Sequence, residues 1–330
     1  MNKIMKSSHI DNDLTQEAEA FDSQIEERIA NGHIPDIRLA EPCDYFYNNS
    51  WRRPAYVKLD FGEQFEVICD SISKLIEKKP TQIRILEVGS GPGYLSLELA
   101  RNGFNVVGLD ISAKCVEIAS QFAEQDPWKE QRGTLDYIAA DFYTSPRLQN
   151  ESFDVVVFLG ALHHFPNQAA TLKRAKELIK PNGLIIAHEP VRDRVTLGNA
   201  TFMHLLRTLL SINNNFYTYQ ELSIDRDQIL SDVDKIYSTL RYERDDGEKL
   251  QSINDNEAGY AEMYPELCNL FKQERFEWRY AFFHEFIGGL RFDEETNVRT
   301  AQFLREMDRI LVETGVLDAT EFLFVGRKVN

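Results

Sequence analysis

The stretch ILEVGSGPGYLSLELA, residues 85–100, changes from a strand-like pattern to a helix-like pattern across three glycines. Its first residues continue an apolar run typical of a buried strand, and its last residues repeat apolar side chains at helical spacing. Gly89, Gly91 and Gly93 let the backbone between the two patterns approach a ligand closely. The first N–H groups of the following helix have no partner within it, so they are available to an anionic group. The stretch therefore predicts a ligand-binding turn.

Short apolar runs alternate with helical patterns between residues 80 and 190. Runs that are apolar throughout are typical of parallel strands with helices on both faces of the sheet. The sequence therefore predicts an α/β fold with a doubly wound sheet in residues 81–190. The predicted strands lie at residues 83–88, 105–110, 135–141, 153–160 and 183–189.

The regions on either side of this core lack the alternation. Residues 1–80 contain two helical repeats of apolar side chains, and they predict an N-terminal helical cap. Residues 191–290 predict a substrate-binding insertion, or lid, in which the polar stretch 241–259 is an exposed loop. Residues 291–330 are expected to complete the core sheet. The elements predicted after the loop are a strand at 276–283, a helix at 299–313 and a last strand at 321–329.

The composition excludes several classes of protein. The chain has 53 acidic and 37 basic residues, and its net charge of −16 would repel a phosphate backbone, so we expect no nucleic-acid partner. No stretch reaches the roughly 18 consecutive apolar residues of a membrane span, and no signal peptide is recognisable. We therefore expect a cytoplasmic protein without a membrane span. The four cysteines are scattered and indicate neither a disulfide framework nor a zinc site.

The spacing of the glycines narrows the choice of ligand. A dinucleotide-binding turn has the pattern G-x-G-x-x-G, and here Tyr94 stands where the last glycine should be. Glu87, directly before the turn, would repel a pyrophosphate but can bind an ammonium group. Both observations weaken the interpretation as a nicotinamide dehydrogenase, which remains an alternative.

Residues 87–93, EVGSGPG, resemble the first motif of class I S-adenosylmethionine-dependent methyltransferases. In that family Asp110 would bind both ribose hydroxyls, and Asp141 and Phe142 would bind the adenine. Residues 159–166, LGALHHFP, look like the segment after strand four in ubiquinone and menaquinone C-methyltransferases. The resemblance implies a Rossmann-like sheet of seven strands with strand 321–329 antiparallel. The cofactor residues that it implies are Glu87, Gly89, Ser90, Gly91, Gly93, Asp110, Ile111, Asp141, Phe142 and Leu159.

Two of these carboxylates have a simpler alternative role. Asp110 alone could cap the helix that begins near Ser112, and Asp141 alone could cap a turn. The ordered set of motifs favours ligand binding, because each motif follows a strand, and open α/β sheets bind ligands at that edge.

Histidines supply the candidates for acid–base chemistry, because imidazole titrates near neutral pH. His163 and His164 follow the fourth predicted strand, and His188 with Glu189 ends the fifth. A third pair, His284 and Glu285, follows the strand at 276–283. Each pair can equally be structural, since transfer of a sulfonium methyl can depend on alignment alone.

Aromatic residues outside the core could contact a substrate or simply pack. Tyr45, Tyr47 and residues 51–53, WRR, could form a lid in which an arginine binds the methionine carboxylate. The insertion contributes further aromatics that could line an acceptor pocket, although they could also form its own core. These are Phe202, Phe216, Tyr217, Tyr219, Tyr260 and Tyr264.

The sequence thus predicts an S-adenosylmethionine-dependent methyltransferase that acts on an oxygen, nitrogen or carbon of a small molecule. Residues 159–162, LGAL, lack the [DN]-P-P-[FY] motif of nucleic-acid amino-methyltransferases and the metal-binding Asp of catechol-type enzymes, so we expect a metal-independent enzyme. A carrier-tethered acceptor stays open, and the sequence indicates no oligomeric state. The alternatives are a non-catalytic S-adenosylmethionine-binding subunit and an enzyme that uses this cofactor for another transfer.

Overall fold

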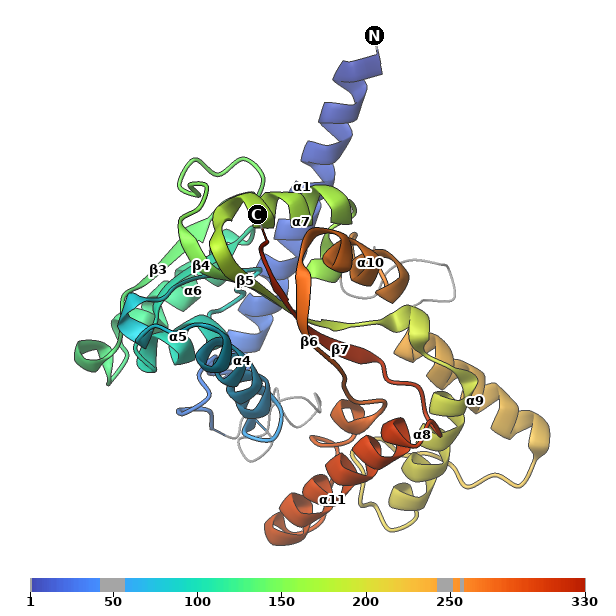
Figure 1. The fold of residues 1–330 in the computed structure, drawn as a ribbon. Helices are drawn as coiled ribbons and strands as arrows, with labels where there is room; N and C mark the ends of the chain where they lie inside the picture. Colours follow the sequence, from blue (N-terminus) through green and yellow to red (C-terminus); the bar gives the residue numbers. More distant parts are fainter. Residues whose placement is uncertain (1, 42–56, 242–251, 256–257, 330) are drawn as a thin grey trace.

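The computed structural model describes residues 2–41, 57–241, 252–255 and 258–329, and these form a seven-stranded sheet with helices around it (Figure 1). The strand order is β3-β2-β1-β4-β5-β7-β6, and the first five strands are parallel. The predicted doubly wound α/β fold is confirmed. The parallel strands are β1 (Arg84–Val88), β2 (Asn105–Asp110), β3 (Leu135–Ala139), β4 (Phe153–Leu159) and β5 (Ile179–Pro190).

The last two strands complete the sheet. β7 (Glu321–Arg327) lies between β5 and β6 (Lys272–Trp278) and is antiparallel to both, as the resemblance implied. β6 begins and ends earlier than the strand that we predicted at 276–283. The strand ends earlier because the N–H groups of residues 281–283 are bound by the buried carboxylate of Asp308, at 2.6 to 2.7 Å.

Helices cover both faces of the sheet (Figure 1). On one face, α4 (Phe61–Leu75) and α5 (Tyr94–Arg101) bury apolar side chains against β1, β2 and β4. α6 (Ala113–Glu124) packs on Tyr137 of β3. On the opposite face lie α7 (Gln168–Leu178) and α10 (Tyr260–Leu270). Burial on both faces explains why the inner strands β1, β2 and β4 are largely apolar, whereas β3, at the edge of the sheet, has exposed residues.

A second hydrophobic core lies beside the sheet. It is formed by α8 (Leu197–Ser211), α9 (Arg226–Leu240), α11 (Glu294–Glu313) and residues 280–290. Figure 1 shows α8, α9 and α11 together at the end of the molecule away from α6. α11 therefore packs with part of residues 191–290, which we expected to form an insertion. In the same range, β6 is a strand of the sheet and α10 packs against the sheet. The described part of the chain also contains the short 3₁₀ helices η1 to η5, at Pro80–Gln82, Lys129–Gln131, Leu162–His164, Arg192–Arg194 and Phe283–Glu285.

The first helix, α1 (Asn2–Ala30), packs against α6. Ile25 is buried against Cys115 and Ile118 of α6. The Asp22 carboxylate accepts hydrogen bonds from the Ser112 hydroxyl at 2.5 Å and from the Lys114 N–H at 3.1 Å. These contacts place α1 across the edge of the sheet where the parallel strands end. Among the described residues, no helix has both the length and the apolar character that a membrane crossing requires.

A buried ionic cluster holds the segment after α1 on the core. The Arg101 guanidinium is 1% exposed and lies 2.6 Å from Asp36 and 2.9 Å from Asp126, both of which are buried. Replacing Arg101 leaves the buried carboxylate of Asp36 without its cation and leaves Asp126 with Arg132 alone, at 3.4 Å. We expect Arg101→Ala to lower the free energy of unfolding by about 3 to 5 kcal/mol, measured by urea denaturation.

The matched control breaks an exposed ion pair. Lys129 lies 2.6 Å from Glu124, and both side chains are well exposed. Lys129→Ala should cost less than about 1 kcal/mol. Equal losses in the two variants would contradict the anchoring role of Arg101.

Candidate active site

A cavity of about 740 Å³ lies where β1, β2, β3 and β4 end. Its walls come from the glycine turn after β1, the loops after the other three strands, one face of α1 and residues 253–254. The volume is in the range of sites that bind cofactors and small molecules, about 300 to 1,000 Å³. The lining includes seven of the residues that the sequence singled out: Gly89, Gly91, Asp110, Ile111, Asp141, Phe142 and His164.

The glycine turn brings bare backbone to the cavity. Gly91 has a φ of +51°, and a Cβ built on it would meet no atom within 4 Å, so its open side is free for a ligand. Gly89 has a φ of +72°, and its Cβ would stand 2.5 Å from the Cβ of Ala161. Gly89 is therefore needed for packing of the turn on the loop after β4, whereas Gly91 leaves space for a ligand.

Asp110 joins the turn to the start of α6. Its Oδ2 accepts the N–H of Gly91 at 2.7 Å, and its Oδ1 accepts the N–H of Ser112 at 2.8 Å. Ser112, whose hydroxyl accepts the N–H of Cys115, is the N-cap of α6. Each carboxylate oxygen can accept a further hydrogen bond. Asp110 therefore orders the turn and can still bind a vicinal diol.

Asp141 and Phe142 line the cavity beyond β3. The Asp141 carboxylate accepts the N–H of Tyr143 at 3.0 Å and the hydroxyl of Thr144 at 2.9 Å, so it caps its own turn. Phe142 is buried, and its ring packs edge-on against Phe158 and Phe165. The pair therefore provides a fixed carboxylate beside an aromatic ring.

Four of the expected cofactor residues are outside the lining. Ser90 is buried, Gly93 lies against Tyr137 and Ala119, and Leu159, the last residue of β4, packs against the core that α4 and α5 form with the sheet. Glu87 is buried below the turn, where its carboxylate accepts a hydrogen bond from the Ser96 hydroxyl of α5. Its contact with an ammonium group remains a prediction. Burial raises the pKa of Glu87 to about 8, from an ordinary value of 4.5.

The raised pKa of Glu87 predicts a pH-dependent stability. The folded chain holds the proton of Glu87 more tightly than the unfolded chain does. The contribution of Glu87 to the free energy of unfolding is therefore complete below about pH 4.5, and it is lost as the pH rises to about 8. Glu87→Gln cannot ionise. Its melting temperature, relative to wild type, should therefore rise between these pH values and level off above them, as measured by thermal unfolding in a series of buffers.

The control for this experiment is Glu66→Gln, which changes an exposed glutamate on α4. Its melting temperature relative to wild type should stay constant over the same pH range. A constant difference for Glu87→Gln as well would show that Glu87 does not titrate in this range.

Glu189 organises the loop after β4 from a fully buried position. Its carboxylate accepts the N–H groups of Ala161 at 3.1 Å, Leu162 at 2.9 Å and His163 at 3.4 Å. The Oε2 of Glu189 is also 2.8 Å from the Nδ1 of His163. Burial lowers the pKa of His163 despite this carboxylate, so a neutral ring is favoured. Both residues lie behind the cavity wall and position the loop.

His164 is the predicted catalytic residue that lines the cavity. Its Nδ1 is 3.0 Å from the Oε1 of Glu17, which lies on α1. Glu17 also accepts the Ser252 hydroxyl at 2.7 Å and the N–H of Asn254 at 2.9 Å. Burial would raise the pKa of Glu17, but the hydrogen bonds of these partners and the charge of His164 together lower it. Three segments remote in the sequence therefore meet at His164.

The other acid–base candidates lie elsewhere. The Nε2 of His188 is 3.8 Å from Glu321, away from the cavity lining. His284 lies between Asp60, at 3.2 Å, and Glu321, at 3.1 Å. Glu285 faces Arg207 at 3.8 Å. The structure thus separates His188 and His284 from His164.

In the described part of the chain, the six aromatic residues that we considered for an acceptor pocket are absent from the cavity lining. Tyr260 and Tyr264 stack on each other and contact Phe276 at the sheet edge. Phe216 belongs to the second core. The aromatic and arginine residues at 45–53 lie outside the described residues.

The sequence interpretation missed one wall of the cavity. It recognised α1 as an amphipathic helix, yet helical periodicity cannot distinguish a face packed on a core from a face over a cavity. Residues 253–254 lie in a polar segment whose pattern indicates no site. The lining residues of α1 are Leu14, Glu17, Phe21, Gln24, Ile25 and Arg28.

Comparison with known proteins identifies the class. A family model described as a methyltransferase domain matches residues 61–279, and the chain belongs to this family. The predicted methyltransferase family is thereby confirmed. The match extends from α4 to the first residue after β6, so it includes the glycine turn and every strand of the sheet except β7.

Among curated proteins, the chain is similar to the ubiquinone biosynthesis O-methyltransferase of Paramagnetospirillum magneticum, with 36% identity over 107 residues. This match covers 32% of the chain and 39% of the relative. The corresponding enzyme of Histophilus somni is 32% identical over 109 residues, which cover 32% of the chain and 44% of that relative. The chain thus matches less than half the length of these relatives.

One solved structure with a similar course of the chain is a SAM-dependent methyltransferase from Methanosarcina mazei. It is 16% identical, with a TM-score of 0.46, and the match covers 78% of this chain and 97% of that chain.

Proposed function

We propose that this chain transfers a methyl group from S-adenosylmethionine to an oxygen of a small, largely apolar molecule. The observation that carries the proposal is the single cavity that joins the Gly91 and Asp110 side to His164 and α1. When bound, the cofactor supplies an electrophilic methyl group on a sulfonium. The choice of oxygen follows the name of the curated relatives, which are O-methyltransferases.

The cofactor side of the cavity fits S-adenosylmethionine in shape and in chemistry. Gly91 and Gly160 both line the cavity, and a Cβ on either would meet no atom within 4 Å. Their backbone is therefore accessible to a ligand. Asp110 would accept the ribose hydroxyls with its remaining lone pairs, and Asp141 with Phe142 would hold the adenine.

The acceptor side consists of α1 and the loop after β4. Leu14, Phe21 and Ile25 of α1 present apolar side chains to the cavity, and Phe165 faces it from the loop. Such a wall favours a flat or apolar acceptor over a highly charged one. Because α1 covers the cavity, it would exclude water from the transferring methyl group and hold the acceptor in line.

His164 would contact the nucleophilic atom of the acceptor, and Glu17 would orient its ring. The contact of 3.0 Å between His164 and Glu17 fixes the orientation of the ring across the cavity. Glu189 and His163 act through the backbone of the loop, so we assign them a positioning role. His188 has no part in this proposal.

The test is incubation with methyl-labelled S-adenosylmethionine and an extract of small molecules, followed by mass spectrometry. We expect a labelled small molecule, and we expect His164→Gln to reduce kcat by about 100-fold or more because the ring accepts the proton of the acceptor. His204→Gln is the matched control, because His204 is a buried histidine of α8 that is absent from the cavity lining.

The outcomes separate the alternatives. Label on a protein rather than on a small molecule would identify a carrier-tethered acceptor. Equal kcat values in the two histidine variants would remove His164 from the chemistry. Binding of S-adenosylhomocysteine without any labelled product, from extracts of several sources, would favour the non-catalytic subunit.

A further inference from the structure

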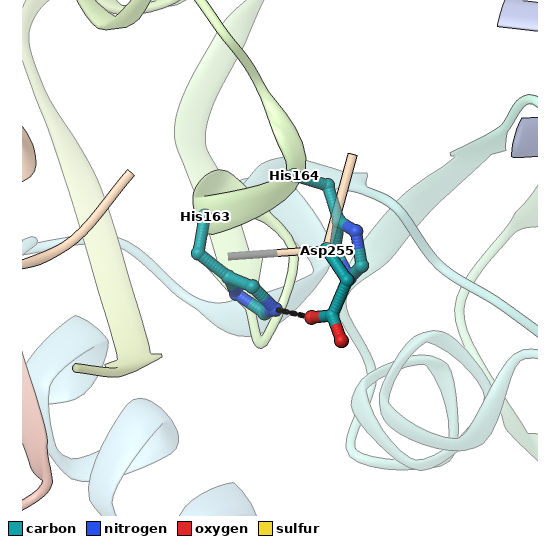
Figure 2. Close-up of side chains that lie close together, drawn as sticks. All are labelled: His163, His164 and Asp255. Carbon is teal, nitrogen blue, oxygen red and sulfur yellow. Dashed lines mark ion pairs between the residues drawn. The ribbon is translucent and has the colours of Figure 1, made fainter. Parts of the chain in front are cut away.

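His163, His164 and Asp255 converge beside the cavity and are not accounted for by cofactor binding. Each offers one ligand atom, and these atoms all lie within 4.8 Å of one another. Figure 2 shows the carboxylate of Asp255 directed at the ring of His163, with the ring of His164 alongside. The two histidines come from η3 and the aspartate from the short described segment 252–255.

Asp255 lacks the partners that a buried carboxylate needs. The residue is 1% exposed, and its Oδ2 has no hydrogen-bond partner among the described residues. Its Oδ1 is 4.0 Å from the Nε2 of His163, which is too far for a hydrogen bond. Because an unpaired buried carboxylate is strongly destabilising, this one calls for a cation.

His163 is oriented as metal-binding histidines are. Its Nδ1 faces the Glu189 carboxylate at 2.8 Å, which leaves its Nε2 directed at Asp255. Metal-ligating histidines commonly donate their other ring N–H to a carboxylate in this way, which fixes the tautomer and the ring orientation. Glu189 is itself held by the backbone of the loop, so the arrangement is rigid.

We propose that His163, His164 and Asp255 bind a divalent first-row transition metal such as Zn²⁺, with Glu189 supporting His163. Two imidazoles and a carboxylate are a ligand set that such ions favour over Mg²⁺. Neighbouring ligand atoms of a tetrahedral zinc lie about 3.3 Å apart, so the side chains would have to move together by roughly 1 Å on binding.

The position of the site gives the metal a function at the cavity. His164 lines the cavity, so an open coordination position beside it would face the acceptor and could bind its oxygen. This extension rests on the proposed function. In it His164 binds the metal, and the metal takes the place of the His164 ring in contact with the acceptor oxygen. Our expectation of a metal-independent enzyme considered only residues 159–162, whereas this site begins at His163 and takes its third ligand from a remote segment.

The test is a titration of the whole, chelator-treated protein with Co²⁺, followed by its visible absorption, and then displacement by Zn²⁺. We expect one equivalent to bind, and Asp255→Asn and His163→Gln to weaken the affinity by about 100-fold or more. The matched controls are His204→Gln and Asp136→Asn, which change a buried histidine of α8 and an exposed aspartate of β3. Both should bind Co²⁺ as tightly as wild type.

Absence of saturable Co²⁺ binding, or equal affinity in wild type and Asp255→Asn, would overturn the metal site. Binding of S-adenosylhomocysteine, measured on the same metal-free samples, keeps the two proposals distinct. If the wild-type protein fails to bind Co²⁺ but binds S-adenosylhomocysteine, the metal site alone is refuted. One equivalent of Co²⁺ bound through Asp255, without binding of S-adenosylhomocysteine, supports the metal site and contradicts the proposed function.

Discussion

The arrangement of the site depends on the buried carboxylate of Glu189. It binds three consecutive N–H groups of the loop after β4, and this contact fixes the positions of His163 and His164 relative to the sheet. Glu189 lies at the end of β5, which pairs with β4 along its length, so the loop is tied to the most buried part of the fold. A hydrogen-bonded carboxylate without solvent around it tolerates little displacement. The cavity wall on this side is therefore rigid.

The opposite wall is assembled from parts that are distant in the sequence. α1 is held on α6 by Ile25 and Asp22, and Glu17 then reaches Ser252 and His164. Together these contacts hold α1 over the cavity. The enclosure thus depends on contacts between segments that are distant in the sequence, whereas the five parallel strands are buried within one continuous segment, residues 84–190.

This difference explains what could be predicted from the sequence. The runs that form β1 to β5 are largely apolar because helices cover both faces of the sheet, so the local pattern was sufficient to predict the strands. Gly91 and Asp110 follow strands whose ends meet at one edge of the sheet, so their place in the site could also be predicted. The roles of Glu17 and Asp255 arise only after distant segments come together, and no spacing encodes them. β6 was misplaced because Asp308, far along the chain, binds the backbone after Trp278.

We propose above all that Asp110, at the end of β2, belongs to a cofactor site. Calorimetric titration with S-adenosylhomocysteine tests it, using wild type, Asp110→Asn and the exposed β3 variant Asp136→Asn. We predict saturable binding of one equivalent, weakened in Asp110→Asn by about 1.5 to 3 kcal/mol, since hydrogen bonds to a charged group are lost, and unchanged in Asp136→Asn. Equal affinity of wild type and Asp110→Asn would contradict the account.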